Sequence, residues 1–518
     1  MDILNNNTQK TMDNAVKSAK DVTKTLGSFI TCTTFSFFYF IIISRLLSPL
    51  ELSVIAIWFV FNGISVMLTG LGFNPTCMQK VPELFVKGEK KEGMGLIKTS
   101  FLSQFIIVSF LALTLNLSAP FISQVFFKTT DFAIFIKIIS FAMVSGKLKD
   151  LFYTLFSVTR QFGKISIIGI VDSIFVRLMA LIPLFFFGFT GYLIALLIGE
   201  VLINILQIFL LRDLLFMRTK FYSFRKLFSY SYPYWIGELV RGATIHADQL
   251  VVGIFLAPEK LAVYYVAKRF FDPLISYSNL LLNPTIPTLS EIKVNGTIAL
   301  ERAFKKVSRY LSFALIPPCL FAASLSYPLL HLFGAGKYLD GLPLTVILSL
   351  SVILYGINTA YSSTVFISGK PKDRLKLIIF EAFLTVSTTF TFLNLFGLLG
   401  VAVARFFSLL GSLLFARYSL AKLNASRFDI SALKRTLLVS IIAVCIVCGL
   451  QILWYDNLLI PLYALVGVVF FLVLFSRNLS KEDITLLESF LPQRLKKLAK
   501  IPYFFGACKK EDIVITSP

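Results

Sequence analysis

Ionisable side chains interrupt the most apolar stretches of this sequence, and their types indicate what they could bind. In the apolar stretch 235–256, Glu238, Arg241 and Asp248 fall within an arc of about 80° on a helix, with His246 off the edge of that arc. Arginine offers paired donors that suit phosphate, and histidine has an unperturbed pKa of about 6.5. The pattern is therefore typical of a polar helix face that binds an anion and responds to a coupling ion.

Other apolar stretches carry similar residues. Asp172 and Glu381 lie 209 positions apart in two of these stretches. Nine further ionisable residues inside apolar stretches are Lys147, Lys149, Asp150, Arg177, Glu200, Lys268, Arg269, Asp272 and Arg405. A charge at the centre of a bilayer costs about 2.5 kcal/mol or more, so each of them requires a partner or a function. The whole set has seven basic and seven acidic members, so a net positive cavity would require some carboxylates to be protonated or to face elsewhere.

A purely structural interpretation of these charges stays open. Pairs spaced i, i+3 neutralise each other on a helix surface. Three pairs have this spacing: Glu238 with Arg241, Lys147 with Asp150, and Arg269 with Asp272. Alternatively, Glu238, Lys149 and Asp150 extend toward the headgroups at the end of their helices.

The elements that must position these residues are transmembrane helices. Of the 518 residues, 56% are hydrophobic and only 15% are charged, which excludes an ordinary soluble domain. A stretch of roughly 18 to 25 apolar residues crosses a hydrocarbon core as a helix. We predict an all-α integral membrane protein with about fourteen such helices, at 26–44, 52–73, 99–117, 132–158, 165–187, 191–211, 235–256, 261–282, 310–326, 342–368, 375–394, 398–416, 436–453 and 458–476.

The sequence also repeats at an offset of 209 residues. Pro49 aligns with Pro258, Asn74-Pro75 with Asn283-Pro284, and FGxxGxxxA at 187–195 with the same pattern at 396–404. Two parallel six-helix copies, related by a pseudo-two-fold axis along the membrane normal, are thereby predicted around a central cavity, with two extra helices at the C-terminal end. The repeated Asn-Pro pairs are expected to end or kink their helices.

Positive charge gathers in alternate loops, which predicts the topology. The segments expected to lie in the cytoplasm are rich in Lys and Arg, and both termini fall on that side. No cleavable signal peptide is expected, and the localisation follows as a multi-pass cell (plasma or inner) membrane protein. We divide the chain into a basic N-terminus 1–25, an N-lobe 26–211, a linker 212–234, a C-lobe 235–425, two helices within 426–476 and a cytoplasmic tail 477–518.

Several classes of function are disfavoured. The net charge of +22 is explained by topology, and no nucleic-acid recognition motif accompanies it. There are two histidines and no Walker or His-Glu-x-x-His motif, so neither an enzyme nor a cofactor or metal is expected. The predicted exterior loops are short, which disfavours a membrane-embedded glycan polymerase or ligase. A major-facilitator transporter is disfavoured because 74–98 lacks the Gly-x-x-x-Asp-Arg-x-Gly-Arg pattern.

The order and spacing of several short motifs resemble a known family. These are SYPYW at 231–235, IHADQLVVGIFLAPE at 245–259, LAVYYVAKR at 261–269, RLLSP at 45–49, LFG at 332–334 with Tyr338, SGKPK at 368–372 and FGLLGVA at 396–402. The set, covering about 26–425, resembles the polysaccharide transporters, the O-antigen-flippase-like branch of the multidrug/oligosaccharidyl-lipid/polysaccharide (MOP) exporter superfamily.

The resemblance implies a flippase that moves a polyprenyl-pyrophosphate-linked oligosaccharide from the cytoplasmic to the outer leaflet by alternating access. The partners expected are that lipid, the membrane and glycan-assembly proteins, with no nucleic acid. The residues expected to line the path and bind pyrophosphate are Arg241, Arg269, Lys268, Arg177 and Asp248, and those expected to serve ion coupling or gating are His246, Glu238, Asp172, Glu381 and Asp272. The alternative is an ion-coupled multidrug or metabolite antiporter of the same superfamily.

Overall fold

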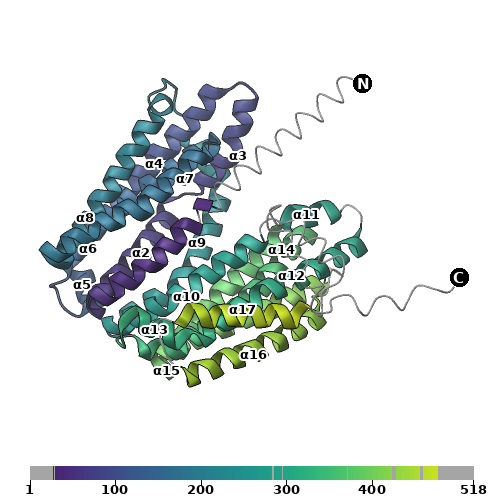
Figure 1. Ribbon diagram of the computed structural model, residues 1–518. Coiled ribbons are helices and arrows are strands. Elements are labelled where there is room, and N and C mark those ends of the chain that lie inside the picture. The colour runs from purple at the N-terminus through teal and green to yellow at the C-terminus, as the bar shows by residue number, and fades with distance from the viewer. Residues whose placement is uncertain are drawn as a thin grey trace. The chain divides into compact units, whose positions relative to one another are not determined.

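The structure is a computed structural model, and it describes residues 27–28, 30–282, 285–293, 296–369, 371–422, 428–454 and 459–476 (Figure 1). Helices make up nearly all of these residues, and no strand occurs among them. The predicted N-terminal segment 1–25 and tail 477–518 lie outside the described residues. The expectation of an all-α fold is confirmed for the part of the chain described.

The described residues form two compact units. The first comprises residues up to Tyr265 together with Thr385–Phe390, and the second comprises Val266–Leu384 and the residues from Thr391 onward. Before the unit boundary lie helices Ile30–Leu46, α2 (Pro49–Thr69), α3 (Phe73–Val86), α4 (Lys90–Leu117), α5 (Ala119–Phe127), α6 (Ala133–Val158), α7 (Phe162–Val171), a π-helical turn (Asp172–Val176), α8 (Arg177–Leu215) and α9 (Phe224–Phe255).

The boundary between the units falls within α10 (Pro258–Leu282). The helices that follow are α11 (Thr285–Lys293), α12 (Thr297–Ser324), α13 (Ser326–Gly334), a 3₁₀ turn (Leu339–Gly341), α14 (Leu342–Ser368), α15 (Pro371–Lys422), α16 (Ile430–Leu453) and α17 (Ile460–Ser476). The units do not divide where the sequence repeat does, because α9, predicted to begin the C-lobe, packs on α2 and α3.

Each predicted membrane span overlaps a described helix, although 26–44 and 458–476 include residues outside the described part and 52–73 and 310–326 run past the ends of α2 and α12. Seven helical segments are long and apolar enough to cross a membrane among the described residues. Two of these, Phe162–Leu215 and Asp373–Lys422, are 54 and 50 residues long, about twice what one crossing requires. Each contains two predicted spans, so the expectation of a multi-pass helical membrane protein is confirmed.

Two equivalent glycines divide these long segments. Gly188 in α8 has φ 65° and ψ −157°, and Gly397 in α15 has φ 59° and ψ −136°. Residues with a Cβ essentially do not occupy this backbone region, so glycine is required for the chain to turn between consecutive helices. The repeated FGxxG motif therefore marks a backbone junction that both copies share.

The helix that begins at Pro49 ends earlier than the Asn-Pro pair predicted. Thr69 is the last residue of α2, and Leu71 and Gly72 have positive φ of 49° and 68°. Asn74 and Pro75 lie in the first turn of α3, where proline is compatible with a helix because its missing N–H would have no partner there. The equivalent Asn283-Pro284 lies outside the described residues.

The two helices outside the repeat pack onto the second unit. α16 contacts α12 and α17, and its Ala443 and Val447 share a buried cluster with Phe321 of α12 and Tyr463 of α17. Asp429 precedes the first residue of α16, and its carboxylate accepts a hydrogen bond from the N–H of Ala432 at 3.0 Å. This N-cap satisfies a backbone donor at the helix start.

Candidate functional site

An open cavity of about 390 Å³ lies between α2 and α9 in the first unit. Both helices are held together near it, since the Trp235 indole N–H donates to the Met67 carbonyl at 3.2 Å. The α2 residues that line the cavity are Phe59, Asn62, Gly63, Val66 and Met67, and the α9 residues are Glu238, Arg241, Gly242, Ile245 and His246.

One glycine from each helix makes room for a side chain of the other. A Cβ added at Gly63 would lie 2.2 Å from His246 Nε2, and one added at Gly242 would lie 1.9 Å from Met67 Sδ. Small residues allow close approach of membrane helices, which here admits the imidazole into the wall of the cavity. The α2–α9 pairing therefore positions His246.

Arg241 supplies the cavity with an exposed guanidinium. Glu238 lies one helical turn away, and no ion pair joins the two in the part of the chain that the structure describes. The Glu238 carboxylate instead extends toward the end of α2, where a Cβ added at Gly70 would lie 3.3 Å from Glu238 Oε2 and 3.7 Å from Lys147 Nζ. The Arg241 donors are thus available to an anion.

Asp248 lies elsewhere on α9. Its side chain is buried, accepts the Tyr264 hydroxyl at 2.7 Å and the Gln249 backbone N–H at 2.8 Å, and is not part of the cavity lining. His246, predicted to lie off the polar stripe, lines the cavity. The hydrogen bond from Tyr264 joins Asp248 on α9 to α10.

Arg177 lies at the start of α8, away from this cavity lining. Its guanidinium donates to Ser36 Oγ and lies 5.8 Å from the ring centroid of Tyr39, whose hydroxyl is 2.9 Å from that of Tyr192. This contact is a cation–π arrangement that ties the helix Ile30–Leu46 to α8.

The two carboxylates spaced by 209 residues have equivalent partners inside their own units. Asp172 is 3.4 Å from Lys149 Nζ, which is 3.2 Å from Glu200. Glu381 accepts from Asn358 Nδ2 at 3.3 Å, and position 358 is the repeat equivalent of 149. A lysine in one copy is therefore replaced by an amide in the other.

Ser412 Oγ completes the set around Glu381, also at 3.3 Å. Sequence reasoning missed both Asn358 and Ser412 because they carry no charge, although aligning Lys149 across the repeat would have identified position 358.

A second buried polar network joins α3, α4 and α6. The fully buried Lys147 pairs with Asp150 at 3.1 Å, as the i, i+3 spacing predicted. Asp150 also accepts from Asn74 Nδ2 at 2.6 Å, and Gln104 Nε2 donates to Asn74 Oδ1 at 3.2 Å. The Asn74 amide therefore links α3 to both α4 and α6.

Lys268, Arg269 and Asp272 lie on α10 in the second unit. Lys268 is buried, Arg269 is half-buried and Asp272 is exposed. Phe271 also lies on α10, and its ring centroid is 5.8 Å from the buried guanidinium of Arg405 on α15. Among the described residues, no group of three or more His, Cys, Asp or Glu is placed to hold a metal ion.

The helical architecture resembles that of solved transporters. A structure of the lipid II flippase MurJ in an inward closed conformation has a TM-score of 0.69 and 17% sequence identity, covering 87% of this chain and 98% of that one. An inward-facing multidrug resistance MATE family transporter of the MOP superfamily has a TM-score of 0.57 and 16% identity, covering 76% of this chain and 95% of that one. The chain therefore shares the fold of these two solved proteins.

The family model described as polysaccharide biosynthesis protein matches residues 42–343. The chain belongs to this family. A curated relative, the probable flippase AglR of Haloferax volcanii, is 25% identical over 197 residues, which cover 37% of this chain and 41% of that protein. The match thus spans less than half of the length of that relative.

Proposed function

We propose that the protein flips a polyprenyl-pyrophosphate-linked oligosaccharide from the cytoplasmic to the outer leaflet by alternating access of its two lobes. The observation that carries this proposal is the exposed Arg241 in an open cavity between two membrane helices. A guanidinium in such a place is costly unless it serves a ligand, and pyrophosphate matches its forked donors. Membership of the polysaccharide biosynthesis protein family supports this class of cargo.

The cavity residues suggest how cargo would be held and released. Arg241 would donate to two phosphate oxygens, while the carboxylate of Glu238 would compete for the same guanidinium once the cargo has moved. Protonation of His246 would add a second positive charge to the wall. Arg177, Lys268, Arg269 and Asp248 remain proposed path residues, and Asp172, Glu381 and Asp272 proposed coupling or gating residues.

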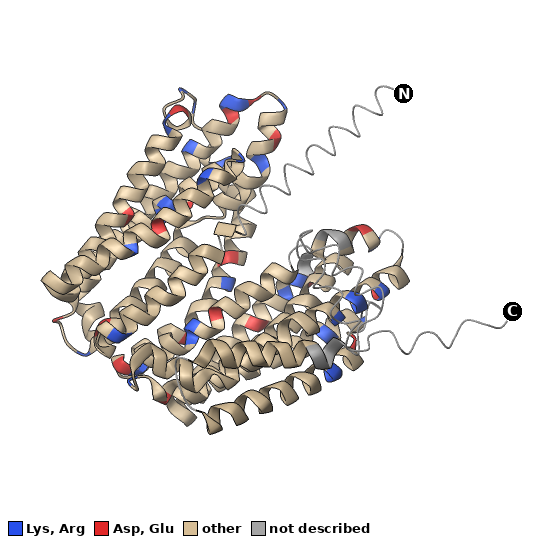
Figure 2. Ribbon diagram, viewed as in Figure 1, with Lys and Arg blue, Asp and Glu red and all other residues tan. Residues whose placement is uncertain are grey.

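The topology belongs to the same proposal. The N- and C-termini would face the cytoplasm of a cell membrane, with residues 26–211 and 235–425 forming the moving lobes, and glycan-assembly proteins would consume the cargo. Figure 2 shows Lys and Arg gathered toward one end of the helices of each unit, which is the end that the positive-inside rule assigns to the cytoplasm.

Transport by purified protein in liposomes would test the proposal. Wild type should move a fluorescent polyprenyl-pyrophosphate disaccharide between leaflets, and Arg241→Ala should slow that movement roughly tenfold or more, the size expected from losing one charged hydrogen-bonding group. Arg241→Lys should recover only part of the rate because it keeps the charge but loses the fork.

Arg212→Ala is the matched control, because Arg212 is exposed near the end of α8 and outside the cavity. Its rate should equal that of wild type. Equal rates for Arg241→Ala and Arg212→Ala would show that Arg241 and its cavity do not bind the cargo.

An ion-coupled multidrug or metabolite antiporter is the second candidate. The likeness to a MATE transporter favours it, although that likeness concerns the fold alone. Robust drug antiport by the same liposomes, with no leaflet exchange of the pyrophosphate lipid, would decide for this alternative.

A further inference from the structure

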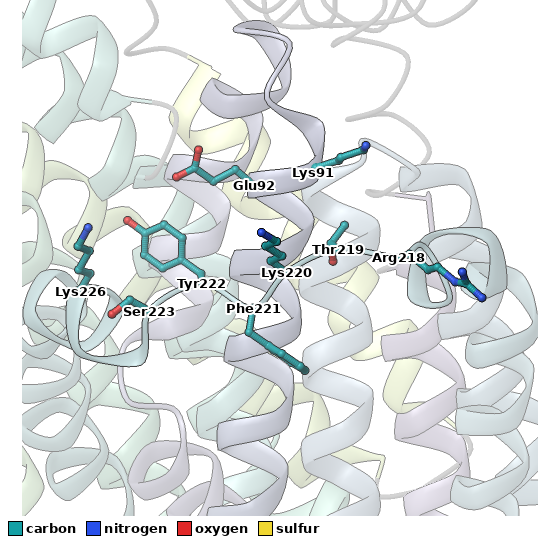
Figure 3. Close-up of a pocket in the computed structure, with 9 residues that line it drawn as sticks. All are labelled: Lys91, Glu92, Arg218, Thr219, Lys220, Phe221, Tyr222, Ser223 and Lys226. Atoms are coloured by element: carbon teal, nitrogen blue, oxygen red, sulfur yellow. The ribbon is translucent and has the colours of Figure 1, made fainter.

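A basic cleft lies at the end of the first unit where α4 begins and α9 begins. Its volume is about 710 Å³, and its lining comes from the first turn of α4, from the connector between α8 and α9, and from the first turn of α9. The lining residues are Lys91, Glu92, Arg218, Thr219, Lys220, Phe221, Tyr222, Ser223 and Lys226 (Figure 3). Four of these are cationic and one is acidic, so the cleft carries excess positive charge.

The cleft is a built feature, because the connector is held against α4 by several contacts. The Thr99 hydroxyl donates to the Tyr222 carbonyl at 3.0 Å, the Tyr222 N–H donates to the Gly95 carbonyl at 3.4 Å, and Lys98 Nζ donates to the Met217 carbonyl. Gly95 is required for this approach, since an added Cβ would lie 2.3 Å from the Lys220 carbonyl oxygen. The backbone thus fixes where the Lys220 side chain begins.

Hydrogen-bond donors accompany the charge. Figure 3 shows Lys220 and Tyr222 projecting from the connector toward the end of α4 that carries Lys91 and Glu92. The Thr219 hydroxyl oxygen is buried and has no hydrogen-bond partner among the residues that the structure describes. A buried hydroxyl normally has a partner, so a ligand oxygen in this cleft would satisfy it.

The connector also carries exposed aromatic side chains. Phe221 lines the cleft and is 63% exposed, and Phe216 and Phe224, close to it in sequence, are 78% and 47% exposed. Exposed aromatic rings beside a basic pocket at the end of membrane helices are typical of the headgroup region of a bilayer. A soluble anion would gain nothing from these rings, whereas a lipid could bury its first carbons against them.

The second copy of the repeat has an aromatic side chain at the position of Gly95. Gly95 corresponds to Phe304, whose ring contacts that of Phe428 with centroids 6.2 Å apart. The segment before α16 is attached in a similar way, since the Asp429 N–H donates to Ser308 Oγ at 3.0 Å and Ser308 is the repeat equivalent of Thr99. The two copies therefore keep the attachment of the connector and differ in whether an aromatic ring fills the space.

We infer that this cleft binds the phosphate or pyrophosphate headgroup of a membrane lipid at the membrane surface. The inference is independent of the proposed flipping of cargo, since binding is measured on the resting protein. Two lipid sources share the chemistry: an anionic phospholipid and an isoprenoid pyrophosphate. Lysine and arginine donors at one headgroup would hold either one.

Native mass spectrometry of the full chain in a neutral detergent would test the inference. The probes are dihexanoyl phosphatidylglycerol, farnesyl pyrophosphate, dihexanoyl phosphatidylcholine and inorganic pyrophosphate. Phosphatidylglycerol or farnesyl pyrophosphate should bind with at least roughly tenfold higher affinity than phosphatidylcholine, and whichever binds tighter identifies the lipid source. Inorganic pyrophosphate binding as tightly as farnesyl pyrophosphate would overturn the assignment to a lipid.

The cleft variant combines Lys91→Gln, Arg218→Gln and Lys220→Gln, and it should lose at least roughly tenfold in affinity for the preferred lipid. Its matched control combines three exposed basic positions outside the cleft, Lys87→Gln, Lys164→Gln and Arg212→Gln, with the same change in net charge. The control should bind like wild type. Equal losses in the two variants would show general surface attraction and overturn the inference.

Gly95→Ala tests the geometry without changing any charge. The added methyl group should displace the Lys220 backbone and weaken lipid binding, while the thermal midpoint of a tag-monitored size-exclusion assay reports whether the fold is kept. If Gly95→Ala protein that keeps its fold binds the preferred lipid as tightly as wild type, the cleft is not the site.

Discussion

Adding one methyl group at Gly188 or Gly397 should destabilise the protein through the backbone alone. Both glycines have positive φ, and an added Cβ would meet no other atom within 4 Å at either position. Steric overlap with neighbouring side chains is thereby excluded. Occupying this glycine-only backbone region costs a residue with a Cβ about 1–3 kcal/mol, so Gly188→Ala and Gly397→Ala should each lower the free energy of unfolding by that amount.

Two other glycines provide matched controls. Gly169 in α7 and Gly449 in α16 also have open space around an added Cβ, and their backbone is helical. Alanine is favoured over glycine inside a helix by about 0.5–1 kcal/mol, so the same methyl group should stabilise here. The two pairs of variants should therefore differ by roughly 1.5–4 kcal/mol, combining the two effects.

Unfolding by sodium dodecyl sulfate in mixed micelles, followed by far-UV circular dichroism, would measure these differences. Each variant adds one methyl group in open space, so changes in contact area cancel between the pairs. Gly188→Ala and Gly397→Ala variants as stable as the controls would refute the assignment of these positions as helix junctions that need glycine.

Three further predictions concern single contacts. Gly63→Ala should destabilise the protein by about 1–3 kcal/mol by displacing His246, and adding His246→Ala should return most of that loss. Additive effects of the two changes in the unfolding assay would contradict a direct contact between Gly63 and His246. Lys147→Met leaves the half-buried Asp150 without its cationic partner, with only the Asn74 hydrogen bond kept, and should cost about 3 kcal/mol. A second change of Asp150→Asn should recover a large part of that loss, and a harmless single variant would argue against the pair. Burial alone would raise the pKa of Asp429, but hydrogen bonds from a serine hydroxyl and a backbone N–H, with cations nearby, hold that pKa below its usual range. Because the folded-state pKa is lowered, the stabilisation from Asp429 is complete at neutral pH and is lost as the pH falls through the lowered pKa. Asp429→Asn should therefore flatten the acid limb of the curve of stability against pH, and an unchanged acid limb would contradict this prediction.

Much of the fold could be predicted because the signals are local. Apolar length marks each span, and the constant offset relates Asp172 to Glu381 without any knowledge of contacts. The junctions at Gly188 and Gly397 were visible as a repeated motif, although the motif by itself did not say that the backbone has positive φ there. The early end of α2 at Thr69 was missed because Pro75 is compatible with either end of a helix.

The candidate site was less predictable because it depends on how helices pair. The helical period brings Glu238 and Arg241 to one face, and both line the cavity. The period could not show that Gly63 of α2 would admit His246, or that Tyr264 would bury Asp248. Contacts between distant segments are set by packing rather than by the local pattern of one helix.

Leaflet exchange by the wild-type protein tests the central claim most directly. Liposomes containing the purified chain would receive a fluorescent polyprenyl-pyrophosphate disaccharide, and accessibility to an impermeant quencher would report its movement. We predict that protein-dependent exchange will occur and that a neutral polyprenyl disaccharide without pyrophosphate will compete poorly, because Arg241 requires an anion. No exchange above protein-free liposomes, or equal exchange of the neutral lipid, would contradict the account.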